Sequence, residues 1–376
     1  MMLFAAAANP AVALDTHRAD VKRFIAHVAN TDDLNKRKLR ELLAAARSQP
    51  AIIEAMDRRA EKTLPWYQYR PIFVNEQRIQ EGVDFWVAHL RDLQQASALT
   101  GVAPEFLVAI LGVETYYGRL TGRYRVLDAL ATLAFDYPSR GPFFRDQLEQ
   151  FLLLTREAKI DPLTATGSYA GAMGAPQFMP SNYRRYAVDA SRDGHVDLWT
   201  NWLDVLASVG NYLQAHGWHA DAPVLSDASV AAGAPREPDG PDLVLSATVG
   251  SLQAEGVRIV NPPPADTPAI LVAADEADGT HWRVGYPNFY AITRYNHSPL
   301  YAMAVCELAA AVKQRLLANP PTRAESMPLL AEWPALAAPL AAPLATPLAT
   351  PLAAPRAATL ARTVNAGSAQ STGTHR

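Results

Sequence analysis

An acidic residue, Glu114, follows a run without charged or polar side chains and precedes two tyrosines and a glycine. The run, residues 106–113, has the length and spacing of a helix whose last turn would carry the carboxyl group. Partial burial and the negative end of the helix dipole both oppose ionisation, so we expect this group to stay protonated longer than a free carboxyl. Such an acid can protonate a glycosidic oxygen. A solvated glutamate at a helix end is the alternative interpretation of the same pattern.

A second segment, residues 168–180, is rich in Gly, Ala and Met and has no clean period. We expect a structured loop that leads into a helix from about Ser181. Small residues let the backbone approach a ligand closely, Gln177 offers a donor and an acceptor, and the aromatic rings offer flat apolar faces. This combination suits a sugar. A tight helix crossing lined by small residues, with methionine as filler, fits the composition equally well.

Oxygen-bearing side chains alternate along residues 189–197, and a glycine occupies the sixth position. This is the opening pattern of an EF-hand calcium loop. Position twelve is Thr200, which cannot supply the usual bidentate carboxylate, and Arg192 adds a positive charge inside the loop. The sequence predicts a structural calcium site here, with a solvated acidic turn as the alternative. The candidate ligands at alternate positions are Asp189, Ser191, Asp193 and His195.

Taken together, these segments resemble the lytic murein transglycosylase B family, glycoside hydrolase family 103. The resemblance extends from about Leu64 to Val312, and four motifs in one order are difficult to obtain by chance. It implies a lysozyme-like helical catalytic core. The motifs are Val113-Glu114-Thr115 followed by Gly118, then Leu127 to Leu133, Ala170 to Pro180, and Ile292 to Ser298.

The resemblance also implies roles for single residues. It makes Glu114 the catalytic acid and base, and it makes Ser168 and Gln177 hydrogen-bonding partners of the substrate. It also makes Asp204 the last calcium ligand of the acidic loop. Arg140 lies where the family often has paired arginines, but Ser139 takes the first place here, which weakens a peptide- or carboxylate-binding role. Further residues implied to line the cleft around the acid are Tyr69, Tyr212, Tyr295, Asn296 and Tyr301; each tyrosine taken alone would be interpreted as a core residue.

Most glycosidases use two carboxylates, whereas these motifs offer one. The resemblance implies that this carboxyl group protonates the β-1,4 oxygen between N-acetylmuramic acid and N-acetylglucosamine and then takes a proton from the muramic C6 hydroxyl. Closure on C1 would give a 1,6-anhydro end without consuming water. The expected partner is the glycan strand of peptidoglycan, bound by a monomer that needs no cofactor for catalysis. A lysozyme-like muramidase and a non-catalytic peptidoglycan-binding protein are the alternatives.

The bulk composition restricts the partners and the location. Among 376 residues, 34 basic and 37 acidic side chains give a net charge of −3, which does not favour nucleic acid. The single cysteine, Cys306, lies in an apolar stretch and is interpreted as a core residue. Residues 1–17 resemble a remnant of a secretion signal, although no Lys or Arg precedes their apolar run and a frayed terminus is the alternative. No stretch predicts a membrane span, and no early cysteine offers a lipid anchor, so we expect a soluble periplasmic protein.

The periodicity predicts a mainly α (α+β) protein with an additional helical region and a small β-containing insertion. Residues 18–221 form the helical domain with the catalytic core and the acidic loop, 222–280 the insertion, 281–319 the return to the core, and 320–376 a disordered Pro/Ala-rich tail. Helices are expected as two short ones within Asp20–Arg59, then Asn75–Ala98, Pro104–Tyr117, within Leu127–Leu154, Trp202–His216 and Pro299–Leu317. Strands are expected at Leu243–Ala247, Ala269–Ala273 and His281–Val284.

Overall fold

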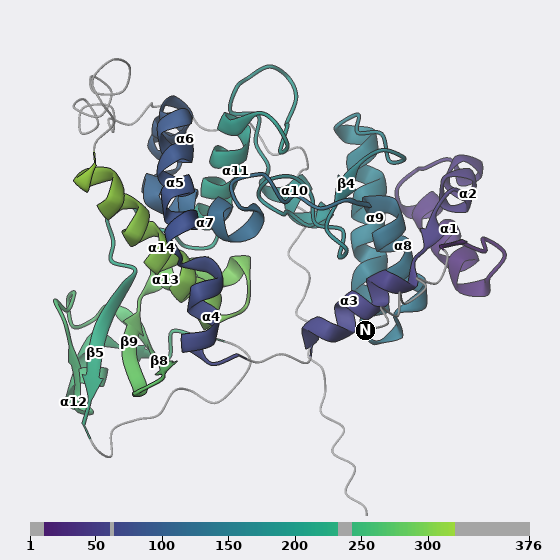
Figure 1. The fold of residues 1–376 in the computed structure, drawn as a ribbon. Coiled ribbons are helices and arrows are strands. Elements are labelled where there is room, and N and C mark those ends of the chain that lie inside the picture. The colour runs from purple at the N-terminus through teal and green to yellow at the C-terminus, as the bar shows by residue number, and fades with distance from the viewer. Residues whose placement is uncertain (1–10, 61–63, 232–242, 320–376) are drawn as a thin grey trace, which may run out of the picture.

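The computed structural model describes residues 11–60, 64–231 and 243–319, and helices dominate this part of the chain (Figure 1). The predicted mainly α (α+β) class is therefore confirmed. Residues 1–10, most of the predicted signal remnant, and the Pro/Ala-rich tail at 320–376 lie outside the described residues. Within the described ranges, no single helix is long and apolar enough to cross a membrane, and only two consecutive helices bent by 112° reach that length together.

One group of helices is built around two consecutive helices, Val126–Asp136 and Gly141–Glu157. Nearly every residue of the first of these is buried. The phenyl rings of Phe24 and Phe135 meet edge to face with 5.6 Å between their centroids, which packs the first N-terminal helix on this pair. The region 20–59 was expected to hold two helices, but it holds three, because a proline at residue 50 begins another. The elements are β1 (Val12–Ala13), α1 (Ala19–Thr31), α2 (Lys36–Ala44), β2 (Arg47–Ser48), α3 (Pro50–Ala60), α8 (Val126–Asp136), the 3-10 helix Pro138–Arg140 and α9 (Gly141–Glu157).

A second group of helices surrounds α7, which is buried from Leu107 to Val113. The helix predicted over Asn75–Ala98 is divided at His89, whose imidazole packs against the rings of Phe85 and Trp202. The helices predicted from Pro104, Trp202 and Pro299 are confirmed within a few residues at each end. The group consists of α4 (Trp66–Phe73), α5 (Glu76–Ala88), α6 (Leu90–Thr100), α7 (Pro104–Thr115), α10 (Pro180–Tyr186), α11 (Trp202–Ala215), α13 (Pro287–Tyr295) and α14 (Pro299–Ala318).

A five-stranded antiparallel sheet with the strand order β6-β8-β9-β5-β7 lies beside α4 (Figure 1). Two of the predicted strands fall inside β8 and β9, whereas Leu243–Ala247 is wrong except for its last residue. β9 continues to Gly285, beyond the predicted boundary at residue 280. The elements are β5 (Leu225–Val230), β6 (Ala247–Thr248), α12 (Val249–Ala254), β7 (Val257–Ile259), β8 (Pro268–Glu276) and β9 (Gly279–Gly285).

Candidate active site

Glu114 lies in the last turn of α7 and is half-buried. The helix ends at Thr115, and Tyr116 and Tyr117 then adopt left-handed conformations with φ of 54° and 60°. Such a conformation is unusual for a tyrosine and persists only where the surroundings impose it. Here the phenol of Tyr117 donates to the carbonyl of Arg78 at 2.8 Å, and its amide donates to Leu111 at 3.0 Å. The chain therefore turns away directly after the acid and leaves it at the end of a rigid helix.

The phenol of Tyr301 donates a 2.7 Å hydrogen bond to Oε1 of Glu114. Tyr301 is only 2% exposed and lies in the first turn of α14, where Ser298 caps the helix by accepting from the Tyr301 amide at 3.3 Å. Burial, and next the charge of Glu114, raise the pKa of Tyr301 well above its usual value. The phenol consequently remains a hydrogen-bond donor at neutral pH and holds the carboxyl group in one orientation.

The loop 168–180 is attached to the elements that carry two of the other three motifs. The hydroxyl of Thr115, adjacent to the acid, donates to the carbonyl of Ala175 at 2.8 Å, and the phenol of Tyr295 on α13 donates to Pro176 at 2.6 Å. The loop then leads into α10 at Pro180, as the sequence predicted. Three motifs far apart in the sequence therefore meet at the end of α7.

Gln177 and Ser168 each keep one polar group available within this loop. The amide nitrogen of Gln177 donates to the carbonyls of Thr121 and Gly174 at 3.0 and 2.9 Å, which uses both of its hydrogens and leaves the side-chain oxygen as an acceptor. The hydroxyl oxygen of Ser168 accepts from two backbone amides of its own loop, at 3.2 and 3.0 Å, so its hydrogen is left to donate.

The remaining tyrosines differ in how they contribute. The ring of Tyr295 stacks on Tyr301 with 6.4 Å between centroids. Tyr69 is close enough to Tyr301 to contribute to the raised pKa of its phenol. Tyr212 is buried behind Tyr295, and its phenol donates to the carbonyl of Arg294 at 2.5 Å, so this side chain supports the group rather than facing a ligand. Asn296 ends α13 and is half-buried beside this group.

Arg140 lies against the α8 and α9 pair. It belongs to the 3-10 helix between α8 and α9, is exposed, and places its guanidinium over the rings of Phe143 and Phe144, 4.9 and 5.4 Å from their centroids. Both rings belong to α9, so these contacts hold the arginine against that helix.

The acidic loop is held by hydrogen bonds of its own. Asp204, which is fully buried in the first turn of α11, accepts from the amides of Ala190, Ser191 and Asp197 at 2.9 to 3.1 Å, and burial raises its pKa. Gly194 has a φ of 88°, in keeping with the sharp turn expected at the sixth position. Among the described residues, no three His, Cys, Asp or Glu side chains form a group that could hold a metal. The predicted ligands Asp189, Ser191, Asp193, His195 and Asp204 thus do not form a preformed cage, because Asp204 is already used by the backbone and Thr200 supplies no carboxylate.

The contacts of two residues of the site were not predicted from the sequence. Thr115 links α7 to the loop, and Arg78 on α5 places its guanidinium over the ring of Tyr116 at 4.3 Å and donates to the carbonyl of Gly112. Burial lowers the pKa of Arg78, which lies inside the structure beside the end of α7. Both act through contacts distant in sequence, which a local pattern cannot reveal.

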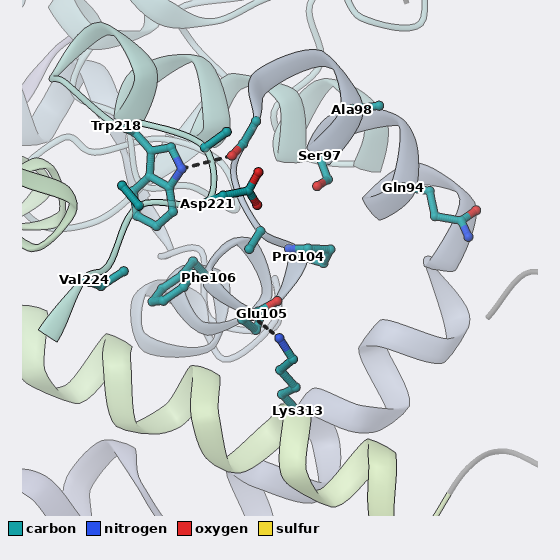
Figure 2. Close-up of a pocket in the computed structure, with 14 residues that line it drawn as sticks. Gln94, Ser97, Ala98, Pro104, Glu105, Phe106, Trp218, Asp221, Val224 and Lys313 are labelled. Carbon is teal, nitrogen blue, oxygen red and sulfur yellow. Dashed lines mark hydrogen bonds and ion pairs between the residues drawn. The ribbon is translucent and has the colours of Figure 1, made fainter. Parts of the chain in front are cut away.

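A hollow of about 550 Å³ lies at the other end of α7, where Trp218, Phe106 and Asp221 face it (Figure 2). Lys313 forms an ion pair with Glu105 at its rim, with 2.6 Å between the charged atoms. Because a helix rises 1.5 Å per residue, the length of α7 places this hollow about 15 Å from Glu114. It is separate from the group around the acid.

Residues 16–310 match the family model of the transglycosylase SLT domain. Over 303 residues the chain is 41% identical to membrane-bound lytic murein transglycosylase B of Escherichia coli (strain K12), covering 78% of this chain and 82% of that protein. The soluble lytic transglycosylase SltB1 of Pseudomonas aeruginosa, in its catenated form, superposes with a TM-score of 0.75 at 42% identity, covering 79% of this chain and 98% of the other. E. coli Slt35, in a structure with calcium, gives a TM-score of 0.73 at 39% identity and covers 82% and 97% of the two chains.

A more distant relative was solved with a cell-wall fragment. SltB3 of Pseudomonas aeruginosa, in complex with NAG-anhNAM-pentapeptide, superposes with a TM-score of 0.67 at 31% identity and covers 78% of each chain. The similarity therefore spans most of the described chain, including the end of α7 and the loop 168–180.

Proposed function

The chain belongs to the lytic transglycosylases with an SLT domain, and on that premise we propose that Glu114 is its catalytic acid and base. The chain is a peptidoglycan lytic transglycosylase with a lysozyme-like helical core. The observation that supports Glu114 is its position: a half-buried carboxyl group at the end of α7, oriented by Tyr301 and next to a loop that offers Ser168 and Gln177.

The proposed reaction uses this one carboxyl group twice. Glu114 first protonates the oxygen that joins N-acetylmuramic acid to N-acetylglucosamine, and the bond from C1 to that oxygen breaks. The substrate's own acetamido group supports the cationic C1. The carboxylate then removes the proton of the muramic C6 hydroxyl, whose oxygen bonds to C1, so Glu114 regains its proton and no water enters. The charge of Glu114 raises the pKa of both Tyr295 and Tyr301, in keeping with a carboxyl group beside these two phenols.

The surrounding residues bind and orient the sugar in this proposal. Ser168 donates to the substrate, the side-chain oxygen of Gln177 accepts from it, and the rings of Tyr69 and Tyr295 with Asn296 line its path. The binding of NAG-anhNAM-pentapeptide by SltB3 supports both the peptidoglycan partner and the anhydro product. The contact of Arg140 with the substrate stays a prediction; its exposed guanidinium lies over Phe143 and Phe144.

Calcium and location complete the proposal. The Slt35 structure in complex with calcium supports binding of this ion by the chain, and the acidic loop is the segment to which we assign it. The ligands would be Asp189, Ser191, Asp193, His195 and Asp204, with Thr200 at the position of the usual bidentate carboxylate, and the ion does not serve catalysis. We place the enzyme, as a monomer, in the periplasm, because its substrate is the cell wall.

Mass spectrometry of purified sacculi digested by the protein tests this function. We expect soluble fragments that end in 1,6-anhydromuramic acid, one water lighter than the products of lysozyme. Fragments that carry only reducing-end muramic acid would instead identify a hydrolysing muramidase. Binding to sacculi without release of fragments would identify a binding protein.

A further inference from the structure

A basic hollow of about 790 Å³ lies beside the loop that carries Ser168. Its walls come from β1, from the end of α2, from β2 and the residue after it, from the short strand β3 (Tyr124–Arg125) and from the first turn of α8. The polar side chains around it are those of Arg47, Gln49, Arg123, Tyr124, Arg125 and Asp128.

The single carboxylate among these lining residues is already neutralised. Asp128 accepts from Arg125 at 2.5 Å, from the amide of Arg47 at 2.8 Å and from the side chain of Gln49 at 3.2 Å. The guanidinium groups of Arg47 and Arg123 are exposed and form no ion pair or hydrogen bond within the described chain. The hollow therefore carries two positive charges without a counterion, arranged around a ligand-sized volume.

The hollow and the proposed site share one piece of backbone. Gln177 donates to the carbonyl of Thr121, and Gly122, with a φ of 99°, lies so close to residues 167 and 168 that a Cβ there would overlap their backbone. β3 pairs antiparallel with β4 (Thr166–Gly167), which ends one residue before Ser168. Because a residue spans at most about 3.6 Å, the Cα of Arg123 lies within about 7 Å of that of Thr121.

We propose that this hollow binds the carboxylate end of the peptide attached to the muramic acid of the substrate, an inference that rests on the proposed function. A guanidinium pairs with a carboxylate through two parallel hydrogen bonds, so two unpaired arginines suit a peptide terminus. A pentapeptide extends up to about 17 Å, which is enough to reach from a sugar at Ser168 to Arg123. The hollow thus selects strands that still carry their peptides.

The test compares two substrates with the full-length chain: glycan strands that keep their pentapeptides, and strands stripped of peptides by an amidase. In the variant R47Q/R123Q we expect KM on peptide-bearing strands to rise about tenfold and kcat to stay the same. KM on stripped strands should not change. The matched control is Arg40→Gln, since Arg40 is an exposed arginine on α2 outside the hollow.

Added salt should reduce the preference of the wild type for peptide-bearing strands, because an exposed charge pair is screened. An equal rise in KM on both substrates, or no rise on either, would overturn the inference while leaving the proposed function intact. If the wild type releases no anhydro product from either substrate, the proposed function itself fails. Thermal melting of the variants separates these outcomes from a loss of folding.

Discussion

The hydroxyl of Tyr301 and Oε1 of Glu114 lie 2.7 Å apart and join residues separated by 187 positions in the chain. One residue begins α14 and the other ends α7, so the bond connects two rigid helices. A carboxyl group that must give and then accept a proton needs one orientation throughout, and this contact supplies it.

Removing that contact should slow catalysis more than it weakens binding. In Tyr301→Phe we expect kcat to fall roughly 10- to 100-fold with KM nearly unchanged, because a small misplacement of a reacting group has a cost of this size. The matched control is Tyr67→Phe, at an exposed tyrosine of α4. Steady-state release of anhydro fragments measures both variants, and a wild-type kcat in Tyr301→Phe would remove the positioning role.

Glu114→Gln should lose activity by at least about 10²-fold, because an amide can neither donate the required proton nor reclaim it. The fold should remain, since glutamine has the same shape and its side-chain oxygen still accepts from Tyr301. Glu105→Gln, at the other end of α7, is the control for a changed carboxyl group on the same helix. Near-normal rates in Glu114→Gln, measured on purified sacculi, would end the assignment of the acid.

Much of this site could be predicted from local sequence. The apolar run before Glu114 and the proline at its start define α7, and the Gly- and Ala-rich composition of 168–180 indicates a loop. These features depend on neighbouring residues, and helix periodicity and turn chemistry report on neighbours.

Contacts between distant segments could not be predicted in the same way. The bond from Thr115 to Ala175 and the division of a helix at His89 depend on which elements meet in space. β5 escaped prediction because its sequence, LSDASV, has few apolar residues, and it is a strand only because β9 and β7 pair with it. The two unpaired arginines of the basic hollow become neighbours only in the fold.

Thr115→Val should uncouple α7 from the substrate loop. The two side chains have the same shape, but the variant leaves the carbonyl of Ala175 without its donor in a buried position. We expect a loss of about 1–3 kcal/mol in the free energy of unfolding and a lower kcat/KM. Thr155→Val, which removes a half-buried bond within α9, is the control and should leave kcat/KM alone. Equal kinetics in the two variants would show that the loop does not depend on Thr115.

Asp204 should stabilise the acidic loop whether or not calcium is present. Asp204→Ala leaves three backbone amides unpaired, so we expect a loss of about 2–4 kcal/mol in the free energy of unfolding. Asp266→Ala, at an exposed aspartate, should change it little. Calcium at ten times its Kd should raise the free energy of unfolding of the wild type by about 1.4 kcal/mol and leave that of Asp189→Ala unchanged. Identical melting of the wild type in calcium and in a chelator would exclude the ion.

The buried tyrosines predict an alkaline limit to stability. Burial raises the pKa of Tyr295 and Tyr301 well above 10, and it also raises the pKa values of Tyr117, Tyr183 and Tyr212. The unfolded chain loses these protons near pH 10, whereas the folded chain retains them. Their stabilising contribution is therefore complete below about pH 10 and is lost as the pH rises further, at up to about 1.4 kcal/mol per pH unit for each phenol.

Urea unfolding at a series of pH values, followed by tyrosinate absorbance, measures this limit. We expect the buried phenols to ionise only as the protein unfolds. In Tyr301→Phe the free energy of unfolding should fall less steeply with pH, by up to the about 1.4 kcal/mol per pH unit that one phenol contributes. Tyr67→Phe is again the control, since it removes the hydroxyl of an exposed tyrosine. Ionisation of all tyrosines near pH 10 in the folded protein would contradict the burial that orients Glu114.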